Sequence, residues 1–191
     1  VVVNDYNDFK KIGNTLDDAA GEAFDKTSKF LGLGYPGGPI IDNLSKKGNP
    51  IFKFSKPKIN DYDFSFSGLK TSIIYFIKKE LKENSKFIED NINDLCSSIQ
   101  HSIVEILVEK TIKCAIDLNI KQICIVGGVS ANSHLREKLN SECLINKFDL
   151  FYPKINYCTD NAAMIAVSGY FNHLNKKFSD LDKVIDSRLS F

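Results

Sequence analysis

Apolar residues recur every three or four positions over much of this chain, which predicts that most of it is helical. The first helix is expected to begin at Thr15, because Asp18 follows three residues later as in a capping box. Gly32 and Gly34 are expected to end it, since glycine is favoured just beyond a helix C-terminus. Its inward face carries Leu16, Ala20, Ala23, Phe24, Thr27 and Leu31.

Three further helices follow from the same period. A short one is expected over residues 39–47, and a longer one over residues 67–83 with Ser67 as its cap. A third covers residues 88–118 and has one apolar face along its length. That face consists of Ile92, Leu95, Ile99, Ile103, Ile106 and Leu107. Residues 48–66 are expected to form a long irregular connection.

Short stretches rich in β-branched residues predict strands between these helices. They span residues 1–4, 8–12, 121–126 and 148–152. A last helix is expected over residues 161–175. The alternation predicts one α/β domain with a helical insertion, largely helical over about 13–118 and built of strands and helices over about 119–175.

Composition indicates an ordinary globular protein. Hydrophobic residues make up 43% of the chain, and the formal net charge of +1 does not by itself indicate nucleic acid. No apolar run approaches the roughly 20 residues of a membrane helix, so we expect no membrane association. Five scattered cysteines are expected to be buried thiols in a reducing cytoplasm. Because the chain starts at Val1 directly in a strand, we expect that an upstream part is missing.

The segment 17–26 carries acids at helical spacing. On a helix, Asp18, Glu22 and Asp25 fall on one face. Such a stack costs roughly a few tenths of a kcal/mol per pair, which a ligand with hydroxyls, a metal or a basic neighbour would offset. Gly21 within the helix suggests a close backbone approach. The alternative is a solvated acidic first turn favoured by the helix dipole.

Two glycine motifs are candidates for ligand binding. The turn 35–39, Tyr-Pro-Gly-Gly-Pro, combines restricted prolines with glycines that leave amides uncovered, and it either lies against a sugar or nucleobase or is only a turn. The strand 121–126 ends on Gly127 and Gly128, and a helix opens near residues 130–132. Nucleotides bind at such strand-to-helix junctions. The motif is neither GxGxxG nor a Walker loop, so a plain connection remains an alternative.

Asp160 is a candidate metal ligand, because a carboxylate at a helix start near a glycine loop can bind a cation. It could instead cap the last helix, unless Thr159 takes that role. His101, His134 and His173 lie on three different predicted helices and form neither HxxxH nor HExxH. They are therefore expected to be surface or packing residues, and no nucleophile elbow or Cys–His pair is evident.

Five motifs, in this order, resemble successive signatures of the TsaD family, with its bacterial type the more similar. They are residues 17–26 (DDAAGEAFDK), 35–39 (YPGGP), 64–71 (FSFSGLKT), 127–132 (GGVSAN) and 157–166 (YCTDNAAMIA). The resemblance extends from the first strand to about Tyr170 and implies the actin/Hsp70/sugar-kinase fold, here its C-terminal half with the family's helical insertion. It implies transfer of a threonylcarbamoyl group from threonylcarbamoyl-adenylate to N6 of the adenosine beside the anticodon in tRNA.

By matching motif positions, the resemblance also implies the binding residues. Asp25, Gly38 and Asn132 would contact the adenylate substrate, and Asp42 would lie near the ribose. The loop at Gly127–Gly128 would border the nucleotide. No catalytic residue follows from the motifs. Partners implied by the family are tRNA and proteins of the TsaB and TsaE types in the cytoplasm.

The resemblance makes Asp160 a ligand of an active-site iron or zinc ion. The family's other ligands are two histidines of an HxxxH motif, and its Ser-Gly-Gly substrate loop precedes the first strand; neither is present in this sequence. One carboxylate does not hold a divalent metal well. We therefore expect the 191-residue chain to be catalytically inactive alone.

Between Asn43 and Lys58 the chain has five lysines and no acid. These are Lys46, Lys47, Lys53, Lys56 and Lys58. They either contact tRNA phosphates, with a salt-dependent contribution each, or form a solvated loop.

Two other classes of protein remain as alternatives. A metallopeptidase, after the glycoprotease label that the family has carried, is disfavoured because the chain has no zincin motif. A non-catalytic scaffold of the TsaB type is disfavoured by the retained Asp160 and the intact motif at residues 127–132.

Overall fold

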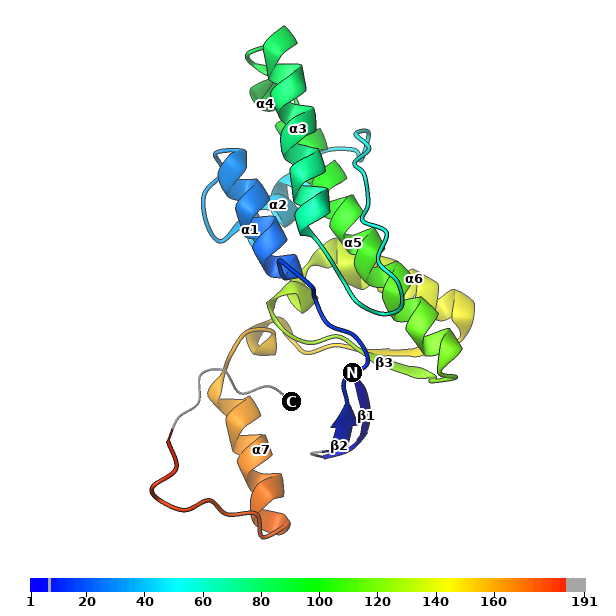
Figure 1. Cartoon of the computed structure of the whole chain (residues 1–191), viewed down its shortest axis with the longest axis vertical. Coiled ribbons are helices and arrows are strands. Elements are labelled where there is room, and N and C mark those ends of the chain that lie inside the picture. Colours follow the sequence, from blue (N-terminus) through cyan, green and yellow to red (C-terminus); the bar gives the residue numbers. More distant parts are fainter. Residues whose placement is uncertain (7, 185–191) are drawn as a thin grey trace.

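The structure, a computed structural model, describes residues 1–6 and 8–184 (Figure 1). It is mixed but mostly helical. The helices are α1 (Ala20–Phe30), α2 (Gly37–Ser45), α3 (Ser67–Glu83), α4 (Phe87–Asp90), α5 (Ile92–Asp117), α6 (Ser133–Asn146) and α7 (Ala162–Leu174). The strands are β1 (Val2–Asp5), β2 (Asp8–Lys10), β3 (Gln122–Cys124) and β4 (Asp149–Phe151), and two 3-10 helices are η1 (Gly128–Ala131) and η2 (Ile155–Tyr157).

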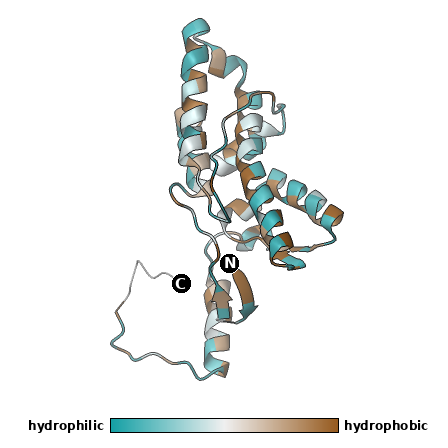
Figure 2. Ribbon diagram, turned by 45° about the vertical axis from the view of Figure 1, so that its right-hand side comes forward, coloured by the Kyte–Doolittle hydropathy of each residue, from teal (hydrophilic) through white to brown (hydrophobic). Residues whose placement is uncertain are grey.

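The long helix α5 is the centre of the structure, because both hydrophobic clusters include its residues. On one side α2 packs directly against α5, and α1 packs against both α2 and α3. Apolar residues of these three helices and of the first half of α5 form one hydrophobic cluster, as the apolar stripes of the helices predict. The fully buried side chains of this cluster include Phe24, Ile41, Leu69, Ile73, Ile77, Leu95, Ile99 and Ile103. Figure 2 shows hydrophobic and hydrophilic residues interspersed along these helices, as amphipathic packing requires.

The second half of α5 packs against a small strand–helix unit. Here β3 and β4 pair in parallel, with Ile123 opposite Leu150, and α6 connects them. Parallel strands need such a crossover, and its helix covers the sheet. The shared core contains Val104, Val108, Ile112, Ala115, Ile123, Leu135, Leu139, Cys143 and Phe148. This unit presents the glycine loop that follows β3.

The hairpin β1–β2 and helix α7 lie beside one another, apart from the helical body (Figure 1). The rings of Tyr6 and Phe171 stack between them, with centroids 3.3 Å apart. No residue of α7 is buried. Its exposed apolar side chains are Met164, Ile165, Val167, Tyr170 and Leu174. Within the described ranges no helix has the length and hydropathy needed to cross a membrane.

Several predicted boundaries are wrong in an informative way. The first helix begins at Ala20, because the Thr15 hydroxyl donates to the carbonyl of Asp18 at 2.8 Å in a turn that precedes the helix. Ser67 is the first residue of α3 and makes no capping bond. The predicted helix 88–118 is two helices, α4 and α5, joined at Asn91. The remaining elements lie within a few residues of their predicted positions.

Candidate functional site

Asp17 anchors the start of α3 through its carboxylate. Its carboxylate accepts hydrogen bonds from the amides of Phe66 at 2.8 Å and Ser67 at 3.2 Å, and from the Ser65 hydroxyl. Partial burial raises the pKa of Asp17, but the hydrogen bonds from Ser65 and the two amides outweigh that effect and lower it. The motifs at residues 17–26 and 64–71 therefore meet in space.

Asp18 is held by two lysines. Its carboxylate oxygens lie 2.6 Å from the ammonium of Lys26 and 2.6 Å from that of Lys70. The hydrogen bonds from Lys26 and then Lys70 lower the pKa of Asp18. The predicted stack of Asp18, Glu22 and Asp25 on one helix is wrong, because Asp18 lies before the first residue of α1. From the sequence, a ligand, a metal or a basic neighbour could compensate the clustered negative charges. The structure contains basic neighbours, Lys26 and Lys70.

Asp25 fixes the entry to α2. Its Oδ1 accepts a hydrogen bond at 2.7 Å from the amide of Gly37, which is the middle residue of the motif 35–39 and the first residue of α2. A Cβ at Gly37 would lie 2.6 Å from the carbonyl oxygen of Phe24, so only glycine lets α1 and α2 approach this closely. The next residue, Gly38, has no heavy atom within 4 Å of such a Cβ and faces open space at the start of α2.

The glycine loop after β3 has the predicted strand-to-helix form. Gly127 adopts a φ of 83°, which glycine tolerates, and η1 then leads into α6. Neither Gly127 nor Gly128 has a heavy atom within 4 Å of a Cβ position. Gly21 of α1 approaches this loop, but an added Cβ would make only an ordinary 3.5 Å contact with Val129. The close backbone approach expected at Gly21 is therefore wrong.

Asn132 and Asp42 come together although 90 positions separate them in the sequence. Asn132 is the N-cap of α6 and accepts from the amide of Leu135 at 2.9 Å. Asp42 accepts from the amide of Ser133 at 3.2 Å and from its hydroxyl at 2.7 Å. Lys46 lies 3.3 Å from the other oxygen of Asp42. The start of α6 is thus attached to α2.

Asp160 lies just before α7 but does not cap it. Asn161 is the cap, since its side chain accepts from the amide of Met164 at 3.1 Å. The capping roles considered for Asp160 and Thr159 are therefore wrong. In residues 1–6 and 8–184, no hydrogen bond or ion pair holds the exposed Asp160 carboxylate.

The described residues do not by themselves complete a metal site. No group of three or more His, Cys, Asp or Glu in those ranges could hold a metal ion. The histidines lie on three helices as predicted, but Nδ1 of His101 and Nε2 of His134 are 3.4 Å apart, a contact that spacing did not reveal. Burial, and then the neighbouring His101, lowers the pKa of His134.

Arg136 joins the glycine loop to the segment before Asp160, a role that no motif or spacing in the sequence indicates. Its guanidinium donates to the carbonyl of Ser130 at 2.5 Å and to that of Pro153 at 2.9 Å. It also lies 3.2 Å from the sulfur of Cys158. Beside this link, a cavity of about 510 Å³ opens between the loop and α7. Its lining includes Val126, Gly127, Pro153, Tyr157, Asn161 and Met164.

The lysine-rich segment is not free of acids in three dimensions. Lys56 lies 2.9 Å from Glu105 and 2.8 Å from Glu109, both on α5. With Lys46 also paired, only Lys47, Lys53 and Lys58 of the five have no ion pair within the described part of the chain. Lys46 thus pairs with an acid one helical turn before it, and Lys56 with acids on a distant helix, although the segment itself contains no acid.

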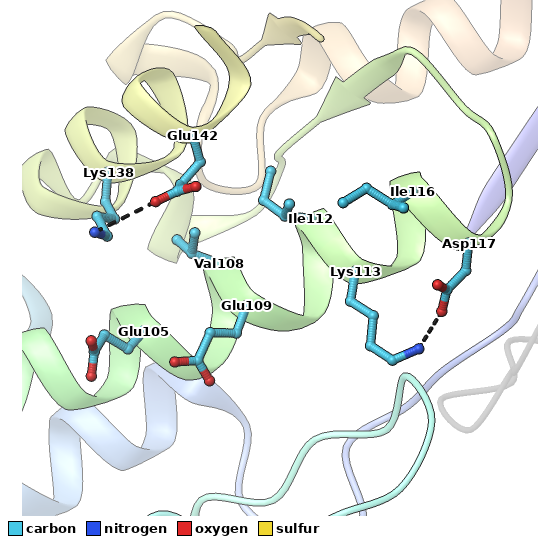
Figure 3. Close-up of a pocket in the computed structure, with 9 residues that line it drawn as sticks. All are labelled: Glu105, Val108, Glu109, Ile112, Lys113, Ile116, Asp117, Lys138 and Glu142. Atoms are coloured by element: carbon cyan, nitrogen blue, oxygen red, sulfur yellow. Dashed lines mark hydrogen bonds and ion pairs between the residues drawn. The ribbon is translucent and has the colours of Figure 1, made fainter. Parts of the chain in front are cut away.

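A separate groove of about 460 Å³ runs between α5 and α6 (Figure 3). Lys113 and Asp117 pair along one helix, and Lys138 lies 3.6 Å from Glu142 along the other. The lining of this groove includes none of the residues that the family resemblance implies for binding the adenylate or the metal.

Comparison with known proteins places the chain. The family profile described as "TsaD: tRNA N6-adenosine threonylcarbamoyltransferase" matches residues 1–167. Proteins named tRNA N6-adenosine threonylcarbamoyltransferase are 51% identical over 189 residues in Riemerella anatipestifer and 49% identical over 191 in Phocaeicola vulgatus. The two matches cover 98% and 100% of this chain but only 55% and 56% of the relatives' own length, respectively. The chain thus spans about half the length of the curated relatives it matches, and it belongs to the TsaD family.

Proposed function

We propose that this chain provides the adenylate-binding side of a tRNA N6-adenosine threonylcarbamoyltransferase. The observation that carries the proposal is the gathering of the implied residues around α2. Asp25 holds its first turn through Gly37, Gly38 is open at its start, and Asp42 attaches it to the start of α6. A helix start with an open glycine is a suitable place for the phosphate and ribose of an adenylate.

The reaction we propose is transfer of the threonylcarbamoyl group from threonylcarbamoyl-adenylate to N6 of the adenosine beside the anticodon. In it, Asn132, Gly127 and Gly128 would border the nucleotide, with Asp25 and Gly38 on the facing side. These residues bind and orient the adenylate so that the carbamoyl carbon meets the attacking nitrogen. The open positions at Gly38, Gly127 and Gly128 support this role, because a side chain there would fill the space.

A metal would complete the site together with residues outside this sequence. Asp160 would supply one ligand to an iron or zinc ion, and two histidines from another part of the protein would supply others. Such an ion, when bound, polarises a carbonyl as a Lewis acid. The Asp160 carboxylate supports this assignment, because no described residue engages it and Asn161 relieves it of capping.

For the whole protein we propose the actin-like fold of the family, with this chain as its C-terminal half. Residues of about 13–118 would form its largely helical region and residues of about 119–175 the strand–helix region with the loop and Asp160. We further propose a cytoplasmic setting, tRNA as the substrate, and partners of the TsaB and TsaE types. Lys47, Lys53 and Lys58, which lack ion pairs among the described residues, are the better candidates for contact with tRNA phosphates.

Calorimetric titration of the 191-residue chain with AMP tests the nucleotide side of this proposal. We expect saturable binding that Asn132→Ala and Gly38→Val both weaken. The matched control is Asn146→Ala, which removes an amide at the other end of α6. Absence of binding, or equal binding by all these chains, would contradict the proposal and favour a scaffold without a nucleotide site.

A further inference from the structure

Gln100 is a buried amide in α5 that lies between two candidate substrate-binding elements. It is only 4% exposed. Its Oε1 accepts a hydrogen bond from Nδ2 of Asn132 at 2.7 Å, and its Nε2 donates to the hydroxyl of Ser45 at 2.8 Å. A buried amide is costly unless both of its ends are paired. Here both ends are paired, each with a different helix.

These bonds continue into a closed ring. The hydroxyl of Ser45 donates to the carbonyl of Asp42 at 2.9 Å. The carboxylate of Asp42 accepts from the hydroxyl of Ser133 at 2.7 Å, and Ser133 follows Asn132 in the chain. The ring thus joins α2, the middle of α5 and the start of α6. Along it, Asn132 donates to Gln100, Gln100 donates to Ser45, and Ser45 donates to Asp42. Hydrogen bonds that run in one direction in this way reinforce one another.

The ring also determines which way the Asn132 amide faces. Its Oδ1 accepts from the amide of Leu135, as a helix N-cap requires. Its Nδ2 must then face α5, where only an acceptor is compatible. Gln100 presents that acceptor because its own amide nitrogen is occupied by Ser45. If the Gln100 amide were reversed, two NH₂ groups would face each other.

We propose that Gln100 is the positioning residue of the adenylate site. It holds the Asn132 amide in one orientation and fixes the start of α6 relative to α2. This inference rests on the proposed function, in which Asn132 and Asp42 contact the adenylate. Binding residues whose orientation is fixed in advance lose less freedom when the ligand binds. Gln100 therefore raises affinity without contacting the ligand.

Titration of the full 191-residue chain with AMP tests this role. Gln100→Met keeps the size of the side chain but removes both hydrogen bonds, and we expect it to raise the Kd about tenfold. Ser102→Ala is the matched control, because Ser102 is buried on the same helix and donates to the carbonyl of Ser98 at 2.8 Å, outside the ring. It is expected to leave the Kd within about twofold of the wild type, whatever it does to thermal stability.

A double-mutant cycle separates positioning from a general loss of stability. If Gln100 acts through Asn132, adding Gln100→Met to Asn132→Ala leaves the Kd of the single Asn132→Ala chain unchanged. A structural effect that is independent of Asn132 would instead multiply the two Kd changes. Should circular dichroism find the Gln100→Met chain unfolded, Ser45→Ala removes one partner of Gln100 instead, with an expected rise in Kd of about threefold.

The outcomes for the two proposals are distinct. Failure of the wild-type chain to bind AMP would overturn the proposed nucleotide site and this inference with it. If the wild type binds AMP, two results would overturn the positioning role alone. One is an unchanged Kd in a folded Gln100→Met chain, and the other is a double-mutant cycle in which the two Kd changes multiply. If Ser45→Ala replaces an unfolded Gln100→Met chain in the experiment, an unchanged Kd for AMP would likewise overturn the positioning role.

Discussion

Asp18 and Lys70 lie 52 positions apart in the sequence, and their side chains form an ion pair at 2.6 Å. The carboxylate is largely buried and also holds Lys26, so the pair fixes α3 against the segment that leads into α1. Two motifs that resemble family signatures are thus one structural unit.

Replacing Lys70 with Met should lower the free energy of unfolding by about 1–2 kcal/mol, because Asp18 loses one of two charged partners while it stays buried. Urea unfolding followed by circular dichroism measures this change. Lys78→Met is the control, since Lys78 is exposed on the same helix and has no ion pair among the described residues. Equal stability of the two variants would contradict a structural role for the ion pair.

The contribution of Asp18 should also depend on pH in a definite direction. Its pKa is lowered in the folded chain, so the stabilisation is fully present above the unfolded-state pKa of about 3.9 and is lost as the pH falls through the lower folded-state value. The difference in unfolding free energy between wild type and Asp18→Asn should be constant from pH 7 to pH 5 and shrink below about pH 4. A difference that grows on acidification would contradict this sign.

Gly37 and Gly38 are adjacent and should respond oppositely to alanine. At Gly37 the added Cβ would lie 2.6 Å from a backbone carbonyl and 2.6 Å from Cβ of Ser28, so we expect a loss of about 1–3 kcal/mol. At Gly38 nothing lies within 4 Å, and Ala is expected to be neutral or to stabilise α2 by up to about 1 kcal/mol. Thermal unfolding of the two variants compares them directly; similar melting temperatures would refute this packing of α1 on α2.

Ser130 should tolerate alanine despite being buried. Its hydroxyl is the one buried side-chain polar atom in the described ranges with no hydrogen-bond partner, and it lies in the candidate nucleotide loop. Removing an unpaired buried hydroxyl relieves its desolvation, so Ser130→Ala is expected to match or exceed the wild-type stability. Ser102→Ala, which breaks a formed bond, should lose about 1 kcal/mol. A clear loss in denaturant unfolding at Ser130 would mean that the hydroxyl has a partner.

The thiols should react with a disulfide reagent in an order set by exposure. Cys124 is exposed and Cys114 partly so, whereas Cys96, Cys143 and Cys158 are buried. Burial raises the pKa of Cys96 to about 12, which suppresses its thiolate further. Mass spectrometry after brief labelling of the native chain should find Cys124 modified first and Cys96 last. Early labelling of Cys96 would contradict the packing of α5.

The sequence predicted the helices well because their apolar period is long and regular. The strands and the glycine loop were also predictable, since Gly127 follows a β-branched run directly. Helix starts were less so: Thr15 has the residue type of a cap, but its hydroxyl bonds within a turn before the helix. Local chemistry permits several starts, and tertiary contacts of Asp17 and Asp18 select one.

Side-chain contacts between residues far apart in the chain could not be predicted from the sequence. No spacing connects Gln100 with Asn132, or Arg136 with Pro153. The lysine segment shows the same limit, because the acids that pair with Lys56 lie on a helix some 50 positions away. Charge patterns along a chain describe a segment, whereas neutralisation depends on what the fold places beside it.

Transfer of labelled threonylcarbamoyl groups from threonylcarbamoyl-adenylate to tRNA tests the central claim most directly. The 191-residue chain would be assayed alone, and after joining to the part of the Riemerella anatipestifer relative that the match does not cover. We predict no transfer by the chain alone, transfer by the joined protein, and at least about a tenfold lower rate with Asn132→Ala or Asp160→Asn. Transfer by the chain alone, or a joined protein indifferent to both substitutions, would contradict the account.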